Sequence, residues 1–185
     1  LESDSQILKS TLGVIAHATQ TVQGSSKFNE LNAVSGLRYH LMSMDAFIRK
    51  NALISMANIV KHSIENSIDI FDESALHLVL KSLTKDPRLN LKIKRSIVDI
   101  LYAVADHYHK TGNQQGCEEF AAMFQASKMA DHLSVLLYLG FASTDRYLKQ
   151  KIAKLEALLT DEKFAGEALA QHMASEMADM AGRIE

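Results

Sequence analysis

Apolar residues return every three or four positions along almost the whole chain, which is the spacing that places them on one side of an α-helix. No segment shows the sustained alternation of apolar and polar residues that is typical of a half-buried strand. We therefore predict an all-α protein. The predicted helices cover about 5–22, 27–42, 45–62, 72–86, 88–110, 115–126, 130–141, 145–159 and 161–180.

A small set of residues marks the breaks between these helices. Gly24, which two serines follow, is expected to end the first helix, and Pro87 forbids a continuous helix across its position. Gly112 lies in a Thr-Gly-Asn turn. With 8 glycines and 1 proline, the chain has too few turn residues for a β-sandwich or β-barrel. We expect residues 1–185 to form a single domain.

Three of the predicted helices open with the same pattern. A small acidic or amide residue is followed three positions later by an aliphatic residue and then at once by a basic one. The pattern begins at Asp45, Asn90 and Asp145, each of which suits the N-cap of a helix. The positions predicted to be buried on these helices are Ile48, Ala52, Met56, Ile97, Leu101, Ile152 and Leu155.

This pattern resembles the second helix of a HEAT repeat, and the spacing of about 45 residues between its first two copies suits HEAT and armadillo repeats. The resemblance covers roughly 27–159, with capping helices at both ends. It implies a short right-handed α-solenoid of helix pairs, in which acidic and basic side chains form a ladder between neighbouring repeats. Asn90 removes a charge from that ladder. An irregular helical bundle is the alternative fold.

For function, the resemblance implies a scaffold or adaptor that binds another protein, because an α-solenoid exposes a long concave face. The partner is expected to be a protein that presents an acidic peptide or a helix. The formal net charge of −2 at pH 7 argues against a dedicated nucleic-acid binder, whose surface is usually strongly basic.

Redox and targeting features favour the cytoplasm. Cys117 is the only cysteine, so an internal disulfide is excluded. No apolar run reaches the length of about 20 residues that spans a bilayer, and the first residues lack the pattern of a signal peptide. Because the chain starts at Leu1 rather than at a methionine, we expect it to be a fragment of a longer protein.

Residues able to support catalysis are few and scattered. The chain has no zinc-protease, dinucleotide or phosphate-loop motif, and His107 and His109, two positions apart, point to different sides of a helix. Cys117 lies near a helix start, a position that can lower the pKa of a thiol, but we interpret it as a small buried or half-buried residue. We predict no enzymatic activity, no cofactor and no metal. An enzyme, the remaining alternative, would need a pocket lined by residues such as His107, His109, Cys117 or Glu118.

Two surfaces are candidates for partner binding. The segment Lys81–Arg95 holds six basic residues and one acidic residue, a net charge of +5, around a loop at Pro87 that we expect to be exposed. It suits an acidic peptide or, as an alternative, nucleic acid or an anionic phospholipid. The last helix is rich in methionine, whose flexible thioether suits adaptable binding surfaces. The candidate residues are Lys81, Lys85, Arg88, Lys92, Met173, Met177 and Met180.

The basic segment gives a first testable prediction. Lys85→Glu, Arg88→Glu and Lys92→Glu in one variant leave the thermal unfolding temperature nearly unchanged, because exposed charges contribute little to stability. The same variant binds an acidic partner more weakly, most of all at low salt, where charges act over a longer distance. The measurement compares wild type and variant on a partner captured from cell extract. An unchanged affinity at low salt would leave the segment without a binding role.

Overall fold

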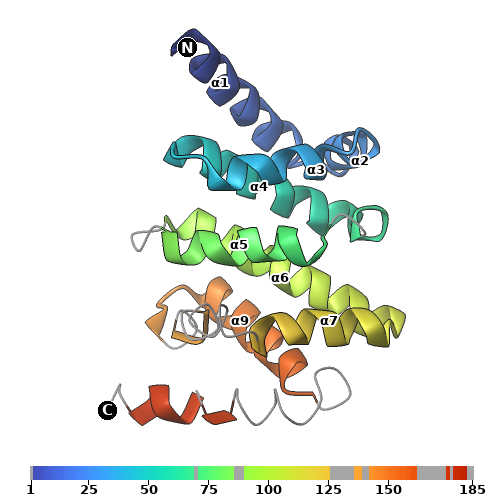
Figure 1. The fold of residues 1–185 in the computed structure, drawn as a ribbon, viewed down its shortest axis with the longest axis vertical. Helices are drawn as coiled ribbons and strands as arrows, with labels where there is room; N and C mark the ends of the chain where they lie inside the picture. The colour runs from blue at the N-terminus through green and yellow to red at the C-terminus, as the bar shows by residue number, and fades with distance from the viewer. Residues whose placement is uncertain are drawn as a thin grey trace. The chain divides into compact units, whose positions relative to one another are not determined.

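The computed structural model describes residues 2–68, 71–85, 90–125, 136–138, 142–161, 174–175 and 177–182. Within these ranges every regular element is a helix (Figure 1), as the apolar spacing predicts. The chain divides into two compact units, Leu1–Ala103 and Val104–Glu185. The helices are α1 (Glu2–Ala18), α2 (Val22–Glu30), α3 (Ala33–Arg38), η1 (Tyr39–Met42), α4 (Ala46–Ser63), η2 (Ile64–Asn66), α5 (Glu73–Lys85), α6 (Leu91–Thr111), α7 (Gln114–Gln125) and α9 (Arg146–Leu159), of which η1 and η2 are short 3-10 helices.

The first unit is built around α4, which α1, α2 and α3 all contact (Figure 1). Two sides of α4 are apolar and buried, one carrying Met56 and the other Leu53. A helix that is apolar on more than one side is buried between neighbours rather than laid on a surface. The seven positions predicted to be buried in the repeated pattern are all buried, none of them more than 5% exposed. They are Ile48, Ala52, Met56, Ile97, Leu101, Ile152 and Leu155.

The predicted end of the first helix is wrong. Helix α1 ends at Ala18, and Gly24 lies inside α2. The hydroxyl of Thr21 accepts a hydrogen bond from the backbone N–H of Gly24 at 3.0 Å and caps α2. A Cβ added to Gly24 would lie 2.0 Å from the carbonyl oxygen of Ala18. This glycine therefore permits a close approach of two helix ends, rather than ending a helix.

The second predicted helix, 27–42, is also divided. Helix α2 ends at Glu30, and Asn32 has a φ of 54°, the left-handed conformation that asparagine tolerates better than most residues. The chain then re-enters a helix as α3 and continues into η1. The apolar spacing continues across the whole segment in the sequence. The break between its two helical parts therefore comes from the left-handed conformation of Asn32.

The three helices that carry the repeated pattern begin as predicted. At each start a side-chain oxygen accepts a hydrogen bond from a backbone N–H of the first turn, which otherwise has no partner in the helix. The bonds run from Ile48 N to Asp45 at 3.2 Å, from Lys92 N to Asn90 at 2.8 Å and from Leu148 N to Asp145 at 2.8 Å.

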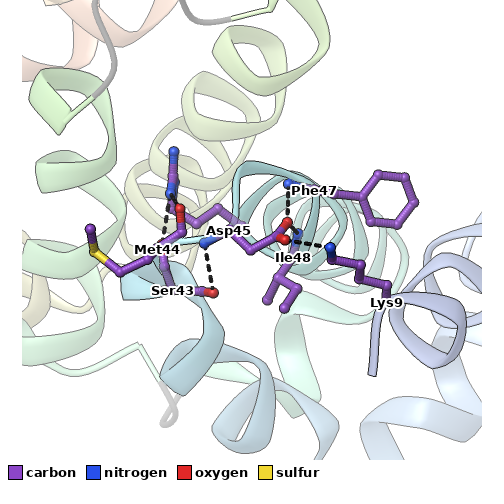
Figure 2. A network of polar contacts seen from close by, with 7 residues as sticks. Lys9, Ser43, Met44, Asp45, Phe47 and Ile48 are labelled. Atoms are coloured by element: carbon purple, nitrogen blue, oxygen red, sulfur yellow. Dashed lines mark hydrogen bonds and ion pairs between the residues drawn. The ribbon is translucent and has the colours of Figure 1, made fainter. Parts of the chain in front are cut away.

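Lys9 of α1 adds an ion pair to the first of these caps, with its Nζ 2.7 Å from a carboxylate oxygen of Asp45 (Figure 2). The hydrogen bond from Lys9, with those from the backbone N–H groups of Ile48 and Phe47, lowers the pKa of Asp45. Lys9 follows an aliphatic residue, as Arg49 does about 40 positions later. Helix α1 thus carries the aliphatic and basic positions of the pattern without its acidic or amide cap, and its Lys9 pairs with the acidic cap of α4.

The next step of the ladder differs, because its cap is the uncharged Asn90. Arg49, the basic residue of α4, directs a guanidinium nitrogen to the loop before its own helix. That nitrogen donates hydrogen bonds to the carbonyl oxygens of Ser43 at 2.7 Å and Met44 at 3.0 Å. Where the cap of the next helix is uncharged, Arg49 thus forms hydrogen bonds to backbone carbonyl groups of the loop before its own helix.

The second unit has its own close contacts. A Cβ added to Gly116, in the first turn of α7, would lie 2.5 Å from the ring of Tyr108, so only glycine fits at this contact. Further along α7, Phe120 and Phe124 meet edge to face, with ring centroids 5.3 Å apart. The predicted helix 130–141 and the last predicted helix lie largely outside the described residues.

A core prediction concerns α6, where Leu101 is fully buried and Leu91 is 43% exposed. Leu101→Ala lowers the free energy of unfolding by about 2–5 kcal/mol, because it removes buried apolar contacts and leaves a cavity. Leu91→Ala, the matched control in the same helix, changes it by less than about 1 kcal/mol. Urea denaturation followed by circular dichroism measures both. Equal losses would mean that the burial assigned to Leu101 is wrong.

The lowered pKa of Asp45 gives a prediction about acid stability. A carboxylate whose pKa is lowered on folding stabilises the folded state above its ordinary pKa, about 3.9, and loses that contribution as pH falls through the lowered value. Asp45→Asn keeps a capping oxygen but has no proton to gain. The urea midpoint of wild type therefore falls more steeply below about pH 5 than that of the variant. Parallel curves would exclude this role for the Lys9 ion pair.

Candidate binding groove

The first unit contains an open pocket of about 450 Å³ that α1, α4 and the first turns of α6 line together. Its apolar lining residues include Ala16 and Ile54. Among the described residues that line it, none is an aspartate or glutamate. The polar and charged lining residues are His17 and Gln20 from α1, Lys50, Asn51 and Asn58 from α4, and Lys92, Arg95 and Ser96 from α6.

Asn51 is the unusual member of this set. Its side chain lines the pocket but is only 6% exposed, and its Nδ2 has no hydrogen-bond partner among the described residues. A buried amide donor without a partner reduces stability by about 1–3 kcal/mol relative to a satisfied one. Such a group in a pocket is set to donate to an acceptor that another molecule brings.

Asn58, two turns further along the same face of α4, has a structural role. Its Nδ2 donates to the carbonyl oxygen of Ala16 and to the hydroxyl of Thr19, both at 3.3 Å. Its own carbonyl oxygen accepts a hydrogen bond from the hydroxyl of Ser25 at 3.2 Å. One asparagine therefore ties α4 to α1 and to the start of α2, while the amide of Asn51 remains available.

Three cationic side chains line the same pocket as Asn51. Lys50 is half-buried, with its Nζ 4.7 Å from the centre of the exposed Phe47 ring. Lys92 is exposed and Arg95 is half-buried. With Asn51 and Ser96, they make the pocket rich in hydrogen-bond donors and positive charge.

The groove residues occupy matching positions in two copies of the repeated pattern. Counted from the caps at Asp45 and Asn90, the fifth residue is a cation in both helices and the sixth is a buried polar residue. These pairs are Lys50 with Asn51 in α4, and Arg95 with Ser96 in α6. The cap that sets the core of each helix thus also sets which residues face the groove.

Of the predicted basic contacts, Lys92 lines this pocket, and Lys81 is exposed on α5 outside the set of lining residues. Lys85 ends α5, but its side chain and the whole of Arg88 lie outside the described residues. Sequence reasoning missed Lys50 and Asn51. The signal that could have found them is a polar pair inside an otherwise apolar helix.

The methionine-rich candidate surface is only partly described. Met180 is buried and Met177 is half-buried, whereas Met173 lies outside the described residues. A binding role for these side chains stays a prediction.

Among the candidate catalytic residues, Cys117 is buried, as the main interpretation of its position predicts. Burial raises the pKa of its thiol, with a smaller effect from the charge of Glu118. Among the described residues, no three histidine, cysteine, aspartate or glutamate side chains gather as metal ligands would. No described helix is long and apolar enough to cross a membrane.

Comparison with solved structures identifies the fold. An engineered protein from the Northeast Structural Genomics Consortium superposes with a TM-score of 0.60 at 18% identity, covering 94% of this chain and 62% of that one. A designed armadillo repeat protein superposes with a TM-score of 0.51 at 19% identity, covering 95% of this chain and 84% of that one. This chain spans less than two thirds of the engineered protein's length. No family profile and no curated protein sequence matches it.

These likenesses, together with the capped helices and their ladder, define an all-α repeat protein. More particularly, the chain has the fold of an armadillo repeat solenoid, in agreement with the predicted fold class.

Proposed function

We propose that this chain is a non-catalytic protein-interaction module that binds an extended segment of another protein in the groove formed by α1, α4 and α6. The observation that carries the proposal is the amide of Asn51, which is buried, lines the groove and has no partner among the described residues. A peptide backbone presents a carbonyl acceptor at every residue, and so provides the hydrogen bond that this amide lacks.

The dimensions suit an extended peptide. Packed helices lie about 8–10 Å apart, so three neighbouring helices span about 20 Å. An extended chain advances about 3.3–3.6 Å per residue and crosses them with about six residues. The apolar lining residue Ile54 offers a contact for a side chain of the bound segment.

The alternatives account for fewer of these features. Nucleic acid and anionic phospholipid would use the basic residues, but a flat membrane surface does not reach a buried amide. Binding to nucleic acid usually relies on a wide basic surface, and the net charge of this chain is −2 at pH 7. An enzyme would use a reactive group, and the raised pKa of the Cys117 thiol makes that residue a poor nucleophile. A cytoplasmic setting suits a protein with one reduced cysteine.

The available amide predicts an unusual mutational result. Asn51→Leu removes a buried donor that has no partner, so the free energy of unfolding stays within about 1 kcal/mol of wild type or rises. The same substitution weakens or abolishes peptide binding. The peptides are selected from a random phage-displayed library on the wild-type chain, then synthesised and measured by fluorescence anisotropy.

Asn58→Leu is the matched control, because it places the same side chain on the same face of α4. It breaks two hydrogen bonds to α1 and lowers the free energy of unfolding by about 1–2 kcal/mol. If every selected peptide binds Asn51→Leu as tightly as wild type, the groove is not the binding site. A large loss of stability in Asn51→Leu would show that its amide has a partner in the folded protein.

A further inference from the structure

We infer that the groove selects an acidic segment of its partner, whose carboxylates lie among Lys50, Lys92 and Arg95. This inference rests on the proposed function and adds to it the chemical class of the bound segment. The sequence predicted a basic contact surface around the loop at Pro87. The inference places it instead in the groove, with two of its three cations at the start of α6 and one on α4.

The charge of the lining carries the argument. Of the eleven described lining residues, three are cationic and none is acidic, although acidic residues outnumber basic ones in the whole chain by 22 to 20. A cluster of like charges raises the local positive potential above that of the surrounding surface. A segment with aspartate or glutamate side chains gains from that potential, and a segment with lysine or arginine side chains is repelled.

The caps of α4 and α6 leave the charge of Lys50 and Lys92 largely uncompensated. Asp45, the cap of α4, is held by Lys9 in an ion pair at 2.7 Å. The matching cap of α6 is Asn90, which accepts the hydrogen bond of Lys92 N without adding a negative charge.

The hydrogen-bonding groups point to carboxylates on a peptide. The ammonium groups of Lys50 and Lys92 and the guanidinium of Arg95 all donate and accept nothing, which matches a carboxylate that only accepts. The amide of Asn51 meets a backbone carbonyl of the same segment, which an acidic peptide supplies and a phospholipid headgroup layer does not. The groove therefore recognises charge and peptide backbone in one place.

The size of the effect follows from the exposure of the cations. An exposed ion pair changes affinity by about two- to fivefold, and reversing a charge also adds repulsion. Lys50→Glu with Lys92→Glu is expected to weaken the binding of an acidic peptide by roughly tenfold or more at about 50 mM salt, and by less at about 200 mM.

The experiment uses the whole chain and random peptides of about twelve residues, long enough to cross the groove. Phage selection on wild type is expected to enrich aspartate and glutamate, whereas selection on Lys50→Glu with Lys92→Glu enriches lysine and arginine. One selected peptide is then measured beside a copy with glutamine and asparagine in place of its acids. Lys50→Gln with Lys92→Gln serves as a second variant that removes charge without reversing it.

The control carries the same change of charge at two lysines that are not among the described lining residues. Lys81→Glu with Lys85→Glu, both on α5, is expected to change the affinity of the acidic peptide by less than about twofold. An equal loss in this control would assign recognition to the segment around Pro87 or to net charge, and would overturn the inference.

Other outcomes separate the inference from the proposed function. Selected peptides that require Asn51 but show no excess of acids would overturn the acidic selectivity and leave the groove as the binding site. Failure to select any peptide that requires Asn51 would overturn both. Tighter binding to phosphatidylserine vesicles than to every selected peptide, lost in the Lys50 and Lys92 variants, would assign the cations to a membrane surface instead.

Discussion

Hydrogen bonds at the helix starts determine much of this structure. Each cap at Asp45, Asn90 and Asp145 fixes where a helix begins, and the helix period then fixes where every later side chain points. The third and seventh residues after a cap enter the core, as Ile48 does in α4. In α4 and α6 the fifth and sixth line the groove, as Lys50 does. Core and binding surface are therefore set by the same few bonds.

The parts of the fold that could be predicted are those with local causes. A cap, an apolar stripe and a turn residue lie within a few positions of each other, so α4 is predicted almost to its ends. Gly24 was misread because its reason is tertiary: the carbonyl of Ala18 lies where a side chain would be. Asn32 was missed because a single left-handed residue leaves no trace in the apolar pattern.

The groove residues likewise divide into those that the local sequence predicts and those that depend on tertiary contacts. Lys92 could be predicted as a contact because it belongs to a run of charges that is visible in the sequence. Asn51 could not, because its significance depends on two facts about other helices: α1 and α6 leave it buried, and neither supplies an acceptor. Asn58, the same residue type on the same face, meets such acceptors on α1. Residue type alone therefore does not distinguish a structural asparagine from an available one.

Asn90 departs from the acidic caps of the other two copies, and its position gives that departure a meaning. Its side-chain oxygen caps α6 as an aspartate would, but the residue is neutral. An aspartate there would place a fixed anion within about one and a half turns of Lys92 and Arg95, where it would compete with any incoming acid. The amide separates the two tasks of a cap, holding the helix start and contributing charge. Asparagine in place of aspartate at a cap thus removes one negative charge from a repeat and leaves the start of its helix unchanged.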